Sequence, residues 1–327
     1  MRALALLAAL LLLAGPAGAS DFTRNAVGTT GSEFLQQDIG ARGIAMGGAY
    51  SAVTNDSNSI YWNPAGLTRV PRLSASLMYA QYVAGVTYNA GNVAARVNDT
   101  TVVAGGWRYR DAGSITQTDI DANTVGTFTP RDYVAEGSFA QSILDLSDSE
   151  MDVTMGVTGR IIHSDYIQKA DGYGGDLGIQ SRFYTAEYAY DLSFVAKNLG
   201  VGQKFDEVRN TMPFEARLGA AMSPIKPLTL SLDAVMPASN IIHGAFGFEY
   251  ASDVTNDIRA AVRGGFNSLT FDSLGVASAL SFGFGIKMGD FSFDYAFVPM
   301  GVLGSDTHRI SFSFNLPAKV SRRYRER

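Results

Sequence analysis

The 327-residue sequence contains no cysteine and only three histidines, His163, His243 and His308. Without cysteine, the chain cannot form a disulfide, a thiolate zinc site or a cysteine nucleophile. The three histidines are far apart and lack the spacing of metal ligands, so we expect no metal site. After residue 19 no run of 18 apolar residues occurs, and the sequence therefore predicts no transmembrane helix.

Positive charge and catalytic motifs are also scarce. The chain has 26 Lys and Arg against 31 Asp and Glu, which argues against general nucleic-acid binding. No Gly-x-Ser-x-Gly elbow is present, and Gly172-Tyr173-Gly174-Gly175 lacks the strand–loop–helix context of a phosphate-binding loop, so we interpret it as a loop tip. We predict no catalytic residues, no cofactor and no enzymatic activity. A hydrolase whose Ser, His and Asp meet only in the fold is the alternative left open.

Residues 1–19 have the pattern of an export signal. Arg2 precedes an apolar run from Ala3 to Ala14, and Ala17-Gly18-Ala19 fits a small-residue cleavage site. The run is too short to span a bilayer, so we expect the segment to be removed and Ser20 to begin the mature chain. An exported chain without a transmembrane helix is either a soluble periplasmic protein or an outer-membrane barrel.

Alternation of apolar and polar residues dominates after residue 71. In 228–234, 280–287, 291–297 and 310–316, large apolar residues alternate with small or polar ones, as in a strand with two different faces. A soluble sandwich has the same period, but a membrane barrel explains the small second face of such long strands. We predict an all-β fold, a transmembrane antiparallel β-barrel of about 14 strands. The expected strands are 72–80, 83–95, 100–110, 132–142, 152–165, 174–183, 188–198, 214–223, 227–236, 243–251, 256–266, 277–287, 290–297 and 307–316.

Long loops and short turns alternate between these strands, which is typical of an outer-membrane barrel with long extracellular loops. An even number of strands predicts that both ends of the mature chain lie on the short-turn, periplasmic side. We therefore expect a protein of the bacterial outer membrane, in contact with its lipid. The expected parts are a signal peptide at 1–19, a plug at 20–71, the barrel at 72–316 and a basic periplasmic tail at 317–327.

One stretch, 40–70, does not alternate. It is rich in glycine and alanine, and the adjacent Gly47 and Gly48 allow its backbone to pass close to other backbone. Pro64 is suited to the first position of a short helix. Because the large residues at 60–62 would be out of place in a surface linker, we predict a compact plug inside the barrel. The candidate plug and lumen residues are Met46, Gly47, Gly48, Asp56, Ile60, Tyr61, Trp62, Asn63 and Pro64.

Three stretches carry a family resemblance. The first is 41–67, with Met-Gly-Gly-Ala at 46–49 and Asn-Pro-Ala-Gly-Leu at 63–67; the second begins with Lys-Asn-Leu-Gly at 197–200 and the third spans 293–311. In this order they resemble the PorV/PorQ family, which is similar to FadL-type outer-membrane transport barrels. The resemblance implies a plugged barrel of fourteen strands. It also implies a role as an accessory or shuttle component of type IX-like protein secretion.

Two main functions therefore remain open, besides a purely structural role. The first is recognition of secretion machinery or cargo proteins at the extracellular rim, which the resemblance favours. The alternative is FadL-like passive transport of hydrophobic small molecules such as fatty acids or aromatic hydrocarbons, which needs an apolar pocket in the lumen. Our hypothesis from the sequence is recognition at the rim, because aromatic and arginine residues favour protein contacts. The candidate rim residues are Phe128, Arg131, Tyr166, Tyr173, Phe205 and Arg209.

Overall fold

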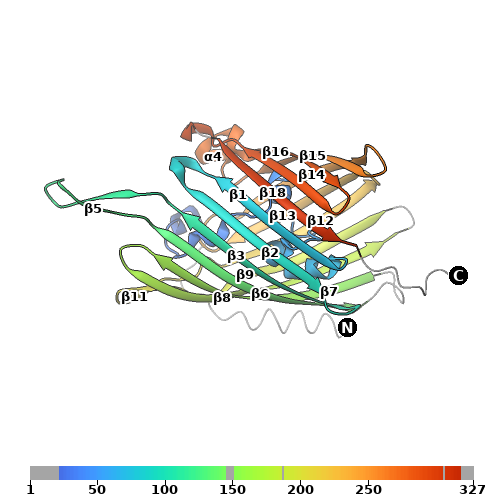
Figure 1. Ribbon diagram of the computed structural model, residues 1–327, viewed down its shortest axis with the longest axis horizontal. Coiled ribbons are helices and arrows are strands. Elements are labelled where there is room, and N and C mark those ends of the chain that lie inside the picture. Colours follow the sequence, from blue (N-terminus) through green and yellow to red (C-terminus); the bar gives the residue numbers. More distant parts are fainter. Residues whose placement is uncertain (1–21, 145–150, 186–187, 305, 318–327) are drawn as a thin grey trace.

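The computed structural model describes residues 22–144, 151–185, 188–304 and 306–317. In this part of the chain, fourteen antiparallel strands close into a barrel in which β1 pairs with both β2 and β18 (Figure 1). The predicted all-β barrel is therefore confirmed. Its strands are β1 (Leu73–Gln81), β2 (Thr87–Arg96), β3 (Thr101–Asp111), β6 (Arg131–Leu144), β7 (Met151–Asp165), β8 (Lys169–Tyr184), β9 (Ala189–Val201), β12 (Glu215–Ile225), β13 (Leu228–Pro237), β14 (His243–Asp253), β15 (Ile258–Asn267), β16 (Leu280–Met288), β17 (Phe291–Val298) and β18 (Thr307–Leu316).

Every predicted strand overlaps one of these strands, and most ends differ by a few residues. The clearest error concerns Gly172-Tyr173-Gly174-Gly175, which we interpreted as a loop tip but which lies inside β8. Its lumen-facing positions, like the buried Ala170 just before it, are small. The stretch is consequently as rich in glycine as a turn. It also lacks the alternation of large and small side chains by which the other strands were predicted.

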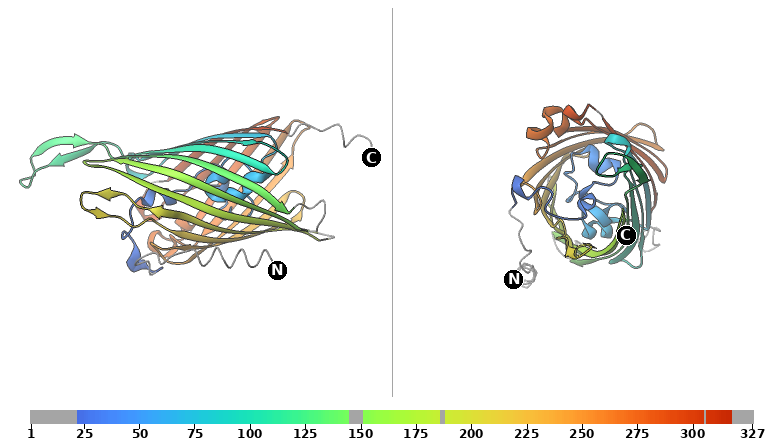
Figure 2. Two further views of the ribbon diagram at one scale, coloured as in Figure 1. Left: turned by 90° about the horizontal axis from the view of Figure 1, so that it is seen from below. Right: turned by 90° about the vertical axis from the view of Figure 1, so that its left-hand side faces the viewer.

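The two ends of the barrel differ in length and shape, as the loop pattern predicts. One end, here the long-loop end, carries two small hairpins that project beyond the wall (Figure 2). They are β4 (Ile115–Thr118) with β5 (Thr124–Phe128), and β10 (Lys204–Phe205) with β11 (Val208–Arg209). The helix α4 (Phe271–Leu274) lies in another connection of this end. The other, short-turn end has connections such as 97–100, 226–227, 254–257 and 289–290.

Aromatic side chains are exposed on the outer face of the wall near both ends. Tyr79, Trp107, Tyr133 and Tyr173 lie toward the long-loop end, whereas Tyr184, Tyr190, Tyr250 and Phe291 lie toward the short-turn end. Between them the outward positions are apolar, for example Leu77, Leu192, Leu232 and Val262. An apolar band between two aromatic girdles is the surface that a membrane barrel presents to lipid. No helix in the described part of the chain is long and apolar enough to cross a membrane.

The segment 40–70 lies inside the barrel, as the end view in Figure 2 shows. Its helices are short: α2 (Ala41–Ala45), α3 (Ser59–Trp62) and the 3-10 helix η3 (Pro64–Arg69). The side chain of Asn63 accepts a hydrogen bond from the Ala65 amide at 3.1 Å, so Asn63 caps η3 and Pro64 begins it. We call residues 40–70 the plug from here on.

The N-terminal part of the chain does not lie where we predicted. β18 ends at the short-turn end as expected, but the residues before the plug lie at the long-loop end. There the Gly31 amide donates a hydrogen bond to the Thr211 carbonyl at 2.9 Å. For the described residues near the N-terminus, the prediction that both ends lie on the short-turn side is therefore wrong, whereas the predicted signal peptide at 1–19 and nearly all of the predicted tail at 317–327 lie outside the described residues. An even number of strands places the start of β1 and the end of β18 at the same end of the barrel. It does not show that the chain first crosses the lumen from the opposite end before β1 begins.

Candidate functional site

The plug and the lumenal wall form the candidate site, and glycines of the wall determine how close they come. A Cβ added at Gly265 of β15 would lie 2.0 Å from the Gly47 nitrogen, and one at Gly156 of β7 would lie 2.3 Å from the Pro64 carbonyl carbon. Side chains at these positions would displace the plug, so glycine is needed for the close approach of two backbones. Further lumenal glycines with such close plug neighbours are Gly178, Gly219, Gly247 and Gly283.

Small polar side chains of the wall bind the backbone of the plug. The Ser281 hydroxyl donates to the Ala45 carbonyl at 3.0 Å, and the Ser231 hydroxyl donates to the Ala49 carbonyl at 2.6 Å. The Ala41 amide donates in turn to the Ser311 hydroxyl at 2.9 Å. Irregular backbone buried from water needs such partners. The small, polar second face of the strands, seen in the sequence, is thus the face that binds the plug.

The large plug residues pack against one another. Trp62 is completely buried, and its ring meets the edges of Tyr50 and Tyr61 at centroid distances of 5.6 Å and 5.2 Å. Its indole N–H donates to the Ile39 carbonyl at 2.8 Å. Ile60 and Met46 are equally buried. Met46, Tyr61 and Trp62 belong to one apolar cluster that the plug shares with the wall. None of these three residues, nor Ile60, lines either of the two cavities described below.

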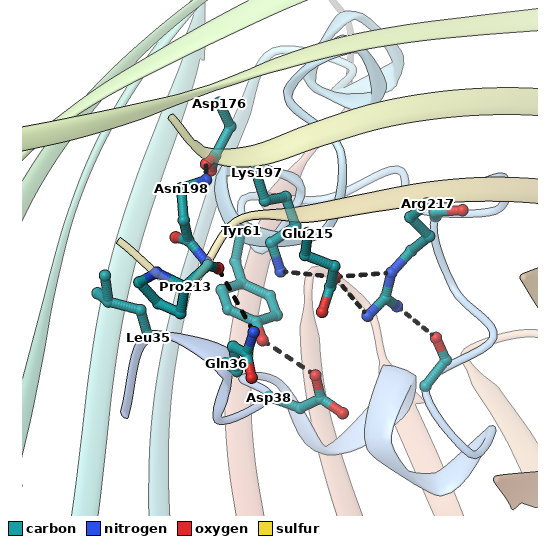
Figure 3. Close-up of polar contacts among 12 residues, drawn as sticks. Leu35, Gln36, Asp38, Tyr61, Asp176, Lys197, Asn198, Pro213, Glu215 and Arg217 are labelled. Atoms are coloured by element: carbon teal, nitrogen blue, oxygen red, sulfur yellow. Dashed lines mark hydrogen bonds and ion pairs between the residues drawn. The ribbon is translucent and has the colours of Figure 1, made fainter. Parts of the chain in front are cut away.

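Buried charges surround Tyr61 in the long-loop half of the lumen (Figure 3). The Lys197 ammonium lies 3.6 Å from the centre of the Tyr61 ring and 3.9 Å from Glu215 Oε1. Arg217 Nη2 lies 3.0 Å from the same carboxylate oxygen, and Arg217 Nη1 donates to the Gly48 carbonyl at 2.8 Å. The Tyr61 hydroxyl donates to Asp38 at 3.0 Å. Buried ion pairs thus join strands β9 and β12, and these strands bind the plug through the cation–π contact with Tyr61 and the hydrogen bond to Gly48.

Asn198, next to Lys197 in the second family-like stretch, has a structural role at an irregularity of the wall. Its φ is 58°, a left-handed conformation that asparagine tolerates better than most residues. The pairing of β8 with β9 shifts register at this point. The Asn198 amide N–H donates to Asp176 at 2.8 Å, and its side chain donates to the Pro213 carbonyl at 2.9 Å (Figure 3). The bulge thus connects the wall to the start of β12.

A second chain of charges lies in the short-turn half of the lumen. Arg42 of the plug binds both carboxylate oxygens of Glu249, at 2.7 Å and 2.8 Å. Arg263 bridges Glu249 and Asp294, at 2.6 Å and 2.7 Å. Asp56 lies beside this chain, in the lining of a cavity of about 420 Å³. Because the lining also includes exposed Lys287, the cavity is charged and does not suit an apolar ligand.

The sequence analysis missed most of these lumenal charges. Arg108, Glu136, Arg160, Arg217 and Arg263 all face inward and are buried. A signal was present, because each stands alone between apolar or small neighbours on a strand that otherwise alternates. The sequence analysis describes this face only as small or polar. The charges balance in pairs, such as Arg108 with Glu136 at 2.9 Å, so the lumen is polar in both halves.

The six candidate rim residues do not form one patch. Tyr166 and Phe205 stack with ring centres 5.6 Å apart and planes at 6°. Arg209 binds the Gly202 carbonyl at 2.7 Å, and Arg131 pairs with Asp111 at 3.1 Å. Tyr173 lies on the outer face of β8, with 57% of its surface exposed, and is not part of a loop. Phe128 ends β5.

A second cavity, of about 370 Å³, is apolar but lies on the outside of the wall. It is formed by the outward faces of β1 and β16–β18, with Leu77, Ile286, Phe291 and Phe312 among its lining residues. Across the described ranges, no group of three or more His, Asp or Glu side chains is arranged to hold a metal ion. The lumen therefore contains a tightly held polar interface, and this apolar cavity is on the outer face of the barrel.

The fold is similar to solved structures of outer-membrane channels. The toluene transporter TbuX of Ralstonia pickettii has a TM-score of 0.55 and 12% identity, and the match covers 86% of this chain and 100% of that one. The toluene transporter TodX of Pseudomonas putida has a TM-score of 0.53 and 13% identity, and the match covers 86% of this chain and 98% of that one. A FadL homologue of Pseudomonas aeruginosa has a TM-score of 0.52 and 11% identity, and the match covers 84% of this chain and 98% of that one. No protein-family model and no curated protein matches the sequence. At this identity, the likeness establishes a FadL-like barrel fold.

Proposed function

We propose that this protein is a non-enzymatic barrel of the bacterial outer membrane that passes small apolar molecules, with its long-loop end toward the cell exterior. The single observation behind this proposal is the fold. The match extends over nearly the full length of barrels described as toluene transporters. The apolar outer face between aromatic girdles supports the location. Because the plug fills the lumen, passage requires part of the plug to move.

An uptake assay tests this proposal. The full chain is produced in a bacterial strain that lacks its own hydrocarbon and fatty-acid channel, and the entry of labelled toluene and oleate is measured. Ser51 of the plug and Ser193 of β9 have hydroxyls 2.9 Å apart, and the chain has no cysteine, so the double variant Ser51→Cys/Ser193→Cys allows a unique disulfide. We expect uptake with the parent chain, loss after oxidation of the double variant, and recovery on reduction. Uptake equal to that of the empty strain would contradict the proposal.

Protein recognition at the rim is the second candidate, and the projecting hairpins favour it. The β4–β5 hairpin extends beyond the barrel and exposes Ile115, Ile120 and Val125 (Figure 2). The PorV/PorQ resemblance implies a secretion partner or cargo at this rim. Replacing residues 112–130 by a short turn tests it, since β3 and β6 pair with each other and need no hairpin to close the wall. Loss of a co-purifying secretion protein with retained barrel folding supports this function; an unchanged set of partners contradicts it.

A further inference from the structure

The N-terminal segment 31–39 and the plug together pass through the barrel from one mouth to the other. At its C-terminal end, the chain leaves the lumen at the short-turn end, where the Arg96 amide donates to the Arg72 carbonyl at 2.9 Å and β1 begins. At its N-terminal end, Gly31 binds Thr211 in the connection that contains the β10–β11 hairpin, at the long-loop end. The described residues before Gly31, Phe22–Thr30, are mainly exposed. The chain is thus on one side of the barrel before the plug and on the other side after it.

Side chains fix this crossing at the long-loop mouth. The Ser32 hydroxyl donates to Gln203 Oε1 at 2.7 Å, and Gln203 is itself held by the Ser164 hydroxyl and the Ala170 carbonyl, at 2.8 Å and 3.0 Å. A Cβ added at Gly31 would lie 2.6 Å from Asn210 Cβ, so the two segments touch. The N-terminal segment therefore binds to loop residues that are already held in place by the wall.

An apolar anchor follows within three residues. Phe34 and Leu35 are 3% and 0% exposed, and they pack with Val134, Ile162 and Met212 of the wall and the β12 connection. Burial of these two large apolar side chains stabilises the contact between the N-terminal segment and the wall. Burial also raises the pKa of the nearby Glu33 carboxyl, although hydrogen bonds from Thr30 and Ser239 oppose the rise. Gly31–Gln36 is therefore packed into the mouth, whereas Phe22–Thr30 is mainly exposed outside it.

We infer that the plug is threaded through the barrel, and that segment Phe22–Thr30 is displayed on the same face as the long loops. This inference rests on the proposed orientation only for the statement that this face is the cell surface. Threading has a physical consequence: the plug cannot leave toward the short-turn side unless Phe22–Thr30 is first drawn through the lumen. Any opening of the barrel must therefore rearrange the plug in place.

Cysteine labelling on whole cells tests the display, because the chain has no native thiol. Three single variants of the full chain are compared with a membrane-impermeant maleimide: Val27→Cys in the displayed segment, Ile120→Cys at the β4–β5 tip as the outside control, and Lys226→Cys in a short turn as the inside control. All three positions are exposed. We expect Val27→Cys and Ile120→Cys to label equally on intact cells, and Lys226→Cys to label at least tenfold less until the cells are permeabilised.

Labelling of Val27→Cys only after permeabilisation, with Ile120→Cys labelled on intact cells, would overturn the inference. If the two controls do not differ, the proposed location or orientation has failed instead. The double variant Gly31→Cys/Asn210→Cys then decides threading in the purified barrel, where orientation does not matter, because a Cβ at residue 31 lies next to the Asn210 Cβ. Oxidation should convert most of the folded protein to a form with altered gel mobility that reduction reverses. A folded barrel that forms no such crosslink would refute the threaded arrangement.

Discussion

Glycine has two opposite effects in the wall of this barrel. At Gly265 an added Cβ would lie 2.0 Å from plug backbone, whereas at Gly159 no atom of the described chain lies within 4 Å of one. We expect Gly265→Ala to destabilise the protein by about 1–3 kcal/mol through overpacking. Gly159→Ala should be neutral or stabilise by up to about 0.5–1 kcal/mol, because glycine is unfavourable inside a strand. The stability of each variant is measured as the temperature at which the folded gel band converts to the unfolded one. Equal shifts of this temperature in Gly265→Ala and Gly159→Ala would argue against a close-fitted plug.

Two arginines of β15 provide a similar comparison for charge. Arg263 is buried and bridges Glu249 and Asp294, whereas Arg259 is about half exposed and lies 3.5 Å from the exposed Asp253. Arg263→Ala leaves two buried carboxylates without this partner, and we expect a loss of about 3–5 kcal/mol. Arg259→Ala should cost less than about 1 kcal/mol, since exposed ion pairs contribute little. Urea unfolding of both variants is the measurement; similar losses would mean that water reaches the Arg263 pair.

The plug depends on the barrel for its structure. α2 and α3 have five and four residues, far below the length at which an isolated helix is stable in water. The wall does not depend on the plug in the same way, because β1 pairs with β2 and β18 along its whole length. We expect deletion of residues 41–66 to leave a closed barrel with an open, polar lumen. Planar-bilayer recordings should then show ion conductance that the parent chain lacks, and a parent-like trace from a folded deletion variant would mean that the wall collapses.

The whole molecule should behave as a membrane barrel. Its outer face is apolar between two aromatic girdles, and its backbone hydrogen bonds are closed by the ring of strands, which is what hydrocarbon requires. We expect the protein to fractionate with the outer membrane, to resist extraction by high salt, and to migrate differently on gels before and after boiling. Recovery of folded protein in the soluble periplasmic fraction would exclude this location and the uptake function proposed above.

The period of the side chains determined the architecture from the sequence alone. A two-residue alternation repeated over long strands, with alternating loop lengths, was sufficient to predict a barrel of fourteen strands. The exception, at Gly172-Tyr173-Gly174-Gly175, failed because small lumenal residues remove the size contrast on which this reasoning depends. The plug was also visible in the sequence, because 40–70 is the stretch where glycine and large apolar residues replace the alternation.

Only the tertiary structure decided what the two sides of the wall contact. Lys197 pairs with Glu215 on the next barrel strand and stacks on Tyr61 of the plug, 136 residues away in the chain, and Arg42 meets Glu249 across 207 residues. Such contacts depend on how the strands curve around the lumen. The alternation of side chains along one strand does not predict which distant residues this curvature brings together. The direction in which the chain crosses the lumen is likewise a tertiary property. Gly31 and Ser32, which precede the plug, find their hydrogen-bond partners at the long-loop mouth, in a connection that follows 171 to 180 residues later in the chain.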